Sequence, residues 1–466
     1  MIRIRMFLFL LVLTNLGLGA TAVRAAAPEA LKTDEFGTAY LFRPEGTPTS
    51  FVYLVSDAHG WGPGWDAAGA ALAAEGAAVL GIDWPSFQAA LDRRDDTCIY
   101  PVSELENVAR RLQRDLNVSQ YLLPVLAGSG EGGSFVYLAL EQAASVMFQG
   151  GVTIDATPAL ATKAPFCDLR PAPVEGQGGF RYAPQALKGW WRAASHDPNA
   201  PDLALMLAAA GADGEKVALP AGADAPSGLV ALLAPKLAAP AAAAAAPATS
   251  GSISALGLES LVEVPAKGGG KPPYLAIVYS GDGGWRDLDR TIAGILADRG
   301  IPAIGVDCLQ YFWHERTPEQ VAGDLAGMIR RYREKWDADK VLLIGYSFGA
   351  GVLPFAYDRL PEAEKSAVVQ ISLLAPELRA DFEVHMAGWF GAAPAETSPP
   401  LAPEMAKLDP KLVQCFYGEE EAKDSFCATP DAAKFEVIRT KGGHHFDGDY
   451  TALANRILEG AKKRGG

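Results

Sequence analysis

The sequence predicts an α/β protein made of two tandem domains, each built on a mostly parallel sheet. Apolar segments of strand length alternate with amphipathic segments of helix length, and this order is typical of parallel sheets covered by helices on both faces. The same order occurs twice in the chain. A segment rich in Ala, Pro and Ser separates the two copies at 238–254. The length of 466 residues also suits more than one domain.

The two halves resemble each other segment by segment, as tandem copies of one fold do. Each half has a strand with a Gly-containing turn, a helix, a second strand, a long helix, and a third strand with a Gly-rich turn. The matching segments are 51–61 and 275–285, 77–84 and 301–308, 102–116 and 317–336, and 122–133 and 341–351.

The N-terminus has the pattern of an export signal, which we place at 1–25. Arg3 and Arg5 precede the apolar run Met6–Leu13, and small residues follow near Ala25. An uncleaved membrane anchor is the alternative, although the apolar run is short for a membrane span. We therefore expect a soluble, exported, periplasmic protein. Its expected domains cover 26–237 and 255–466, with the linker at 238–254.

The net charge of −14 argues against nucleic acid as a partner, because nucleic-acid-binding surfaces are basic. Hydrophobic residues make up 49% of the chain and charged residues 21%, which is ordinary for a globular protein.

Five cysteines in an exported chain suggest disulfides. The most economical pairing joins Cys98 to Cys167 and Cys415 to Cys427, which leaves Cys308 free and buried at a strand end. Connectivity cannot be fixed from the sequence alone.

The segment around Ser347 reads as a strand, a tight turn and the start of a helix. The turn Gly345–Gly349 has the G-x-S-x-G pattern of a nucleophile elbow, in which a strained backbone exposes the serine hydroxyl. Glycines on either side lack the Cβ atoms that would clash in so tight a turn. The pattern predicts an α/β-hydrolase fold for the second half. A non-catalytic Gly/Ser turn is the alternative.

A serine needs a base, and in this fold the acid and then the histidine follow the serine in the chain. His444 is the first choice for the base and His445 the second, on a loop after a predicted edge strand. Glu421 follows another strand by the usual spacing and is the first choice for the acid, with Asp424 as the alternative. A metal site or a polar loop is the other interpretation of the His-His pair. No further ligand spacing supports a metal, so we expect neither metal nor cofactor.

An oxyanion hole needs two N–H donors. We expect one from Phe348, the residue after the serine, and one from Asp282 or Gly283 in the Gly-rich loop after the first strand of the second half. This loop lacks the Lys and Ser/Thr of a phosphate-binding P-loop.

The first half keeps the Gly-rich turn but places Gly130 where the second half has Ser347, and it has Asp224 where the second half has His444. We therefore predict a degenerate hydrolase-like domain. The alternative is independent chemistry, for which His59 and His196 are its only histidines.

Three adjacent aromatic residues, Tyr311, Phe312 and Trp313, follow a strand end on the face that carries the predicted site. They are assigned to substrate binding as the lining of a lipid-accepting mouth or a contact with the membrane. A packed lid is equally compatible with the pattern.

With these motifs in place, the second half resembles the VirJ/AcvB family of exported bacterial virulence-associated proteins. The chain is similar to the long, two-domain AcvB form. It departs from the family pattern at Gly351, where an aspartate is expected. The motifs that carry the resemblance are SGDGGW at 280–285, YFW at 311–313, GYSFGA at 345–350, CFYGEEE at 415–421 and GGHHFDGDY at 442–450.

The resemblance implies a periplasmic serine hydrolase that cleaves the aminoacyl ester of lysyl-phosphatidylglycerol, an aminoacylated phospholipid. It also implies a link to virulence and to type IV secretion components as partners. Such a substrate calls for a carboxylate that holds its ammonium groups, with Asp282 and Asp447 as candidates. The competing interpretation is a non-enzymatic periplasmic binding or chaperone protein built on two hydrolase-like domains.

Overall fold

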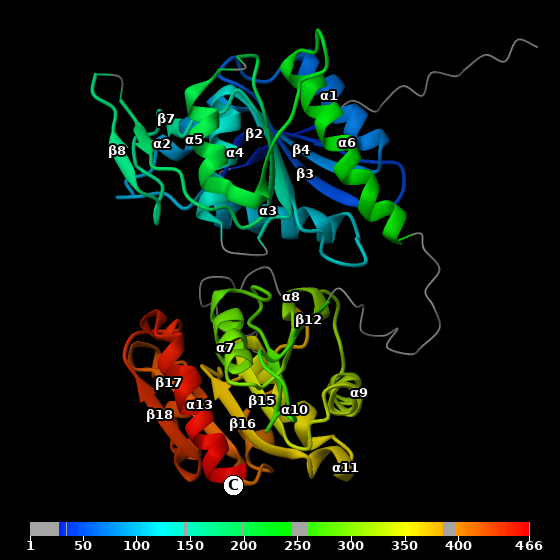
Figure 1. The fold of residues 1–466 in the computed structure, drawn as a ribbon, viewed down its shortest axis with the longest axis vertical. Coiled ribbons are helices and arrows are strands. Elements are labelled where there is room, and N and C mark those ends of the chain that lie inside the picture. The colour runs from blue at the N-terminus through cyan, green and yellow to red at the C-terminus, as the bar shows by residue number, and fades with distance from the viewer. Residues whose placement is uncertain are drawn as a thin grey trace, which may run out of the picture.

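The computed structural model describes residues 28–465 except 34, 144–146, 177, 198, 245–259 and 385–396. The predicted signal segment 1–25 and most of the predicted linker lie outside the described residues. Figure 1 shows two sheet-containing units, one from each half of the chain.

The first half forms an eight-stranded sheet whose inner strands are parallel. The strands β1 and β2 run antiparallel to each other, and β2 pairs antiparallel with β4. In spatial order the strands are β1 (Glu29–Thr33), β2 (Gly37–Phe42), β4 (Ala77–Ile82), β3 (Ser50–Val55), β5 (Val125–Ser129), β6 (Gly150–Ile154), β10 (Trp190–Ala194) and β11 (Gly214–Lys216). A small separate sheet holds β7 (Ala159–Leu160), β9 (Phe180–Tyr182) and β8 (Pro171–Pro173).

The second half forms a seven-stranded sheet with one antiparallel edge strand, β12. In spatial order its strands are β12 (Leu261–Val264), β14 (Ala303–Val306), β13 (Leu275–Tyr279), β15 (Val341–Tyr346), β16 (Val368–Leu374), β17 (Val413–Gly418) and β18 (Glu436–Thr440). Every other neighbouring pair in this sheet is parallel.

The two sheets have the same topology. Leaving β1 aside, the order β2-β4-β3-β5-β6-β10-β11 matches β12-β14-β13-β15-β16-β17-β18 strand for strand, with the antiparallel strand at the same edge. This correspondence confirms the predicted fold class of two tandem α/β units with mostly parallel sheets. The inner strands are buried on both faces, which explains why the sequence shows continuous apolar runs rather than alternation.

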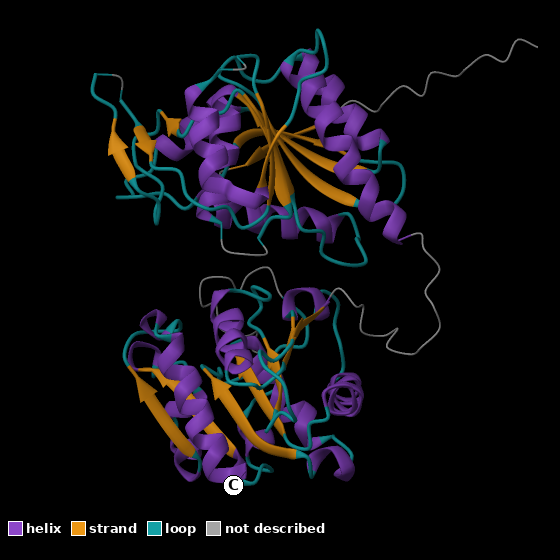
Figure 2. Ribbon diagram, viewed as in Figure 1, coloured by secondary structure: helices purple, strands orange, loops and turns teal. Residues whose placement is uncertain are grey.

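Helices cover both faces of each sheet (Figure 2). In the first half α1 and α6 pack together on one face, and α3 and α4 lie on the other. In the second half α7 and α13 share one face, and α9 and α10 share the other. The bounds are α1 (Pro63–Ala74), α2 (Trp84–Asp92), α3 (Pro101–Asp115), α4 (Gly130–Gln142), α5 (Pro201–Ala210), α6 (Ala225–Ala244), α7 (Asp287–Asp298), α8 (Cys308–Tyr311), α9 (Pro318–Trp336), α10 (Phe348–Asp358), α11 (Glu362–Lys365), α12 (Ala402–Met405) and α13 (Tyr450–Gly465).

The first residues of the predicted linker, 238–244, lie within helix α6. Helix α6 continues through Ala244, because alanine has the highest helix propensity and the absence of an amphipathic period does not stop a helix. The remaining part of the predicted linker lies outside the described residues, and the domain boundaries stay a prediction.

Both predicted disulfides are present, Cys98–Cys167 and Cys415–Cys427, and Cys308 is free and buried as expected. Within the part of the chain that the structure describes, no helix combines the length and the apolar character needed to span a bilayer.

Candidate active site

Ser347 lies in the turn between β15 and α10, with φ +52° and ψ −115°. Such a conformation costs on the order of 1–3 kcal/mol for a non-glycine residue. The turn is held by a hydrogen bond from the Ser347 N–H to the carbonyl of Leu374, at 2.8 Å. A Cβ built on Gly345 would lie 2.6 Å from the Gly349 oxygen, and one on Gly349 would lie 2.6 Å from the Ser280 oxygen. The predicted elbow, with its two obligatory glycines, is therefore present.

The structure brings the predicted serine, histidine and acid into one hydrogen-bonded chain. His444 Nε2 lies 2.8 Å from Ser347 Oγ, and His444 Nδ1 lies 2.7 Å from Glu421 Oε2. The other carboxylate oxygen of Glu421 accepts from the Gly418 N–H at 3.0 Å, which fixes its orientation. A carboxylate at Nδ1 favours the tautomer with the proton on Nδ1, so that Nε2 can accept the serine proton.

The two alternatives to these residues lie elsewhere. The ring of His445 contacts the Tyr346 hydroxyl through Nδ1 at 3.2 Å, so this imidazole braces the loop rather than approaching Ser347. Asp424 is exposed, and its backbone N–H donates to the carbonyl of Glu421. The geometry thus selects His444 and Glu421.

Glycines allow two loops to meet: the acid loop, which follows β17 and carries Glu421, and the histidine loop, which follows β18 and carries His444. A Cβ on Gly418, at the end of β17, would lie 2.5 Å from the carbonyl oxygen of Gly442. Gly442 itself has φ +76°, a conformation that side chains disfavour. The Cys415–Cys427 disulfide ties β17 to the segment that follows Glu421.

The electrostatic surroundings set the protonation of the two histidines in opposite directions. Burial lowers the pKa of His444, but the hydrogen bond to Glu421 and the nearby charges of Glu421, Glu377 and Asp282 outweigh burial, so its pKa is raised overall. Burial and the charge of His444 lower the pKa of His445. Sequence reasoning missed Glu377, a half-buried carboxyl in the loop after β16. Burial raises the pKa of Glu377 to about 7, with the negative charge of Asp282 adding to the effect and His444 opposing it.

The predicted oxyanion donors lie on two segments that adjoin the serine. Phe348 is the first residue of α10, where backbone N–H groups have no acceptor within the helix. The loop after β13 runs beside the elbow: Gly349 donates to the Ser280 carbonyl at 3.1 Å, and a Cβ on Gly281 would lie 3.7 Å from the Ser347 Cβ. Which amide of this loop, Asp282 or Gly283, serves as the second donor stays a prediction.

The aromatic segment does not line an open mouth, which corrects the predicted substrate-binding role of Tyr311, Phe312 and Trp313. All three side chains are buried, with at most 2% exposure. Tyr311 donates its hydroxyl to Asp324 of α9, and Phe312 packs against the Phe348 ring at 4.9 Å. Trp313 packs against Tyr121 of the first half, with 5.1 Å between the ring centres. The sequence of the second half alone could not predict this contact.

The first half has the elbow without the nucleophile. Gly130 occupies the serine position with φ +54°, close to the +52° of Ser347. A Cβ on Gly128 would lie 2.5 Å from the Gly132 oxygen, which repeats the close approach between Gly345 and Gly349. The expectation that this half lacks a matching serine and histidine agrees with the geometry.

The two histidines of the first half are exposed and paired with nearby carboxylates. His59 lies beside Asp57 at 3.2 Å, and His196 beside Asp155 at 2.6 Å. Neither reproduces the Ser347–His444–Glu421 arrangement.

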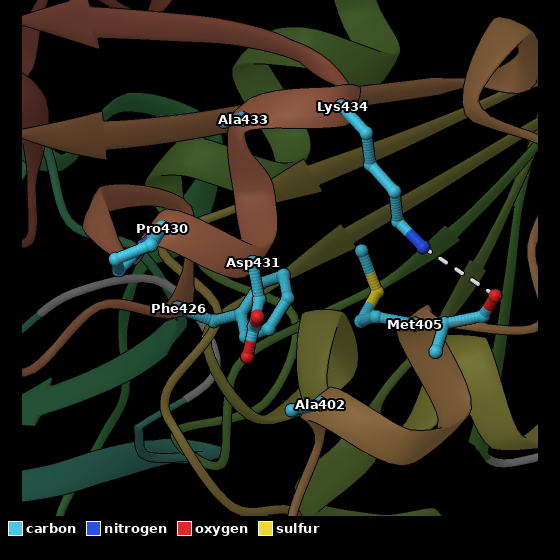
Figure 3. Close-up of a pocket in the computed structure, with 8 residues that line it drawn as sticks. Ala402, Met405, Phe426, Pro430, Asp431, Ala433 and Lys434 are labelled. Carbon is cyan, nitrogen blue, oxygen red and sulfur yellow. Dashed lines mark hydrogen bonds between the residues drawn. The ribbon is translucent and has the colours of Figure 1, made fainter.

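A pocket of about 470 Å³ lies away from this site, between α12 and the segment that follows the Cys415–Cys427 disulfide. In Figure 3 the Lys434 side chain reaches across it toward the carbonyl of Ala406, at 3.4 Å. None of the predicted site residues lines this pocket. Its lining residues are Ala402, Met405, Ala406, Phe426, Pro430, Asp431, Ala433 and Lys434.

The solved structures to which the chain is similar at low identity include the following three. Est1E from Butyrivibrio proteoclasticus is 11% identical over 44% of this chain and 93% of its own, with a TM-score of 0.33. MenH from S. aureus is 12% identical over 44% and 99%, with a TM-score of 0.34. XC6422 from Xanthomonas campestris, a serine hydrolase without a lid, is 16% identical over 44% and 88%, with a TM-score of 0.29.

No curated protein matches the sequence. The segment 273–465, which contains the elbow, the acid loop and the histidine loop, matches the family model described as bacterial virulence protein (VirJ). This match agrees with the resemblance seen in the motifs. The similarity to this family thus lies in the second half of the chain, the half that carries Ser347, Glu421 and His444.

Proposed function

We propose that the protein is a serine hydrolase that cleaves a carboxylic ester through an acyl-enzyme. The observation that carries the proposal is the chain of hydrogen bonds from Glu421 through His444 to Ser347, with the serine on a strained elbow. These are the parts that activate a hydroxyl near neutral pH.

Each residue has a defined task in the proposed reaction. Ser347 Oγ attacks the ester carbonyl while His444 Nε2 takes the hydroxyl proton, and Glu421 stabilises the resulting imidazolium. The tetrahedral oxyanion accepts from the Phe348 N–H and from an amide of the loop after β13. The alcohol leaves with the proton from His444. A water molecule, activated in the same way, then releases the acyl group and restores Ser347.

For the substrate we propose the aminoacyl ester of lysyl-phosphatidylglycerol, as the VirJ/AcvB resemblance implies. Two carboxyl groups near His444 support a cationic acyl group, since Glu377 and Asp282 both act on the pKa of His444. Asp447 is a weaker candidate, because it is exposed and lies against Gly442.

For the location we propose export to the periplasm, which the two disulfides support because disulfides persist in oxidising compartments. A peripheral membrane contact, a role in virulence and type IV secretion components as partners belong to the same proposal. They rest on the family resemblance.

The test is release of free lysine from vesicles that contain lysyl-phosphatidylglycerol. We expect release by the wild type and by the surface control Ser366→Ala, and none by Ser347→Ala. If none of them releases lysine while a fluorophosphonate still labels Ser347, the lipid substrate is wrong and the hydrolase stands. If labelling fails too, a non-enzymatic binding protein becomes the better account.

The role of Glu377 is tested by comparing a lysyl ester with the neutral alanyl ester. Loss of one charge-assisted hydrogen bond should lower kcat/KM about tenfold or more for the lysyl ester in Glu377→Gln, and leave the alanyl ester within about twofold. Equal losses on both esters would remove Glu377 from cation recognition.

A further inference from the structure

Helix α3 of the first half places two buried charged side chains at the contact with the second half. The side chains of Glu106 and Arg110 are 0% and 2% exposed. They are one helical turn apart and form an ion pair at 2.8 Å. Burying charges is costly and gives little net stability, so a buried pair of this kind is better explained by the geometry it imposes. Figure 1 shows α3 on the side of the first half that faces the second.

The pair continues into the second half through Arg286, the residue that precedes α7. The same oxygen of Glu106 that accepts from Arg110 also accepts from Arg286 Nη2. Arg286 also donates from Nε to the Gly283 carbonyl at 2.6 Å. A guanidinium can hold two acceptors in a fixed relative position, which a lysine ammonium does less well.

Gly283 belongs to the loop that adjoins the nucleophile. The Arg286 contact fixes the carbonyl of the Gly283–Gly284 peptide, and the N–H of that peptide donates to Gly281 at 3.1 Å. Since Gly281 lies against Ser347, the position of α3 is transmitted to the backbone beside the reacting oxygen.

A second contact between the halves ends at the other oxyanion donor. Trp313 donates from its indole to the Val118 carbonyl at 3.1 Å, and the Arg114 guanidinium lies 4.2 Å from the centre of its ring. Arg114 also donates to the Val384 carbonyl at 2.8 Å. The neighbouring Phe312 packs on Phe348, whose N–H is the first predicted donor.

We propose that the first half is a positioning element for the oxyanion hole, with Glu106 as the positioning residue that holds the loop at Gly283 through Arg286. The inference rests on the proposed hydrolase function. It gives the first half, which has no nucleophile, a part in the reaction. The N–H donors of an oxyanion hole must be held within about 0.5 Å of the productive geometry, and the first half supplies that support. Loss of one such donor lowers kcat by roughly 10²–10³.

The kinetic test compares three substitutions with the wild type on one activated ester. Glu106→Ala removes the acceptor, whereas Glu106→Gln keeps an oxygen for Arg286. Arg286→Lys keeps the charge but lacks the rigid fork that holds Glu106 and Gly283 in a fixed relative position. The matched control is Lys188→Ala, which breaks the exposed Lys188–Asp287 pair across the same interface.

We expect Glu106→Ala and Arg286→Lys to lower kcat about tenfold or more, with KM within about twofold. The acid limb of the pH profile should not move, because His444 and Glu421 are untouched. Glu106→Gln and Lys188→Ala should stay near the wild type. A folded Glu106→Ala with wild-type kcat, or with a change in KM alone, overturns the proposal. If Glu106→Ala does not fold, the partly exposed Arg286→Lys decides in the same way.

Hydrogen exchange of the peptide 280–286 gives a readout that does not depend on turnover. We expect faster exchange there in Glu106→Ala than in Glu106→Gln, and unchanged exchange in β15. Unchanged exchange at 280–286 overturns the positioning role. A wild type that hydrolyses no ester refutes the proposed function instead, and the exchange comparison still decides whether Glu106 holds the loop.

Discussion

Replacing Glu421 by glutamine tests the role of the acid through the imidazole tautomer that its hydrogen bonds favour. One carboxylate oxygen accepts from the Gly418 N–H at 3.0 Å, and the other faces His444 Nδ1 at 2.7 Å. In Glu421→Gln the Gly418 N–H requires the amide oxygen on its side. The amide NH₂ must then point at His444.

The imidazole would respond by adopting the wrong tautomer. An NH₂ donor facing Nδ1 favours a proton on Nε2, the atom that must accept the proton of Ser347. In the reverse orientation the amide NH₂ of the glutamine would face the Gly418 N–H, and neither of these two donors would have an acceptor. We therefore expect a loss in kcat of about 10³–10⁴-fold, the effect of forcing the wrong tautomer in a serine triad. This loss corresponds to roughly 4–5 kcal/mol of activation free energy.

The assay is the steady-state hydrolysis of an activated ester by Glu421→Gln beside the control Asp424→Asn. Asp424 is exposed and makes no side-chain contact with His444 in the described structure, so this control should keep its activity within about twofold. Circular dichroism verifies that both proteins are folded. A loss below tenfold in Glu421→Gln, or a large loss in Asp424→Asn, would refute the assignment of the acid.

Three further predictions follow from the same geometry. Gly349→Ala should abolish activity or folding, because its Cβ would lie 2.6 Å from the Ser280 oxygen. Fluorophosphonate labelling measures the activity and thermal unfolding measures the stability. A variant that is folded and active would contradict the steric requirement for glycine in the elbow. Joint replacement of Cys415 and Cys427 by alanine should lower the free energy of unfolding by about 3 kcal/mol in urea titrations, given a separation of 12 residues; an unchanged midpoint would show that the bridge does not brace this loop. The kcat/KM should fall as the pH drops through the pKa of His444. That pKa lies above the ordinary value near 6.5 because Glu421 stabilises the imidazolium. A midpoint of the pH–kcat/KM profile at or below about 6.5 would contradict the raised pKa.

Much of the site follows from sequence because its parts are local. The Gly345–Gly349 turn needs glycines for steric reasons that a short motif records, and the acid and histidine each follow a strand by a short, fixed spacing. The sequence favoured His444 and Glu421 but left His445 and Asp424 open, because residues on one loop differ mainly in the direction in which the loop turns their side chains. The hydrogen bonds of His444 to Ser347 and Glu421 settle that direction.

What the sequence missed depends on contacts between distant segments. Trp313 looked like part of an open mouth because the segment that covers it, around Tyr121, lies in the other half of the chain. Nothing near Glu106 marks it as a partner of Arg286, since charged residues on a helix are usually solvated. The fold class was predictable because buried parallel strands leave long apolar runs, whereas the packing of one half on the other leaves no such pattern.

The central claim is that Ser347 is the nucleophile of a hydrolase built from the second half of the chain. The most direct measurement is mass-spectrometric mapping of the adduct formed when the purified protein reacts with a fluorophosphonate, beside Ser347→Ala and His444→Ala. The account predicts one adduct on the peptide that contains Ser347, none in Ser347→Ala, and labelling slowed by several orders of magnitude in His444→Ala. An adduct on another residue, or no adduct on the folded wild type, would contradict it.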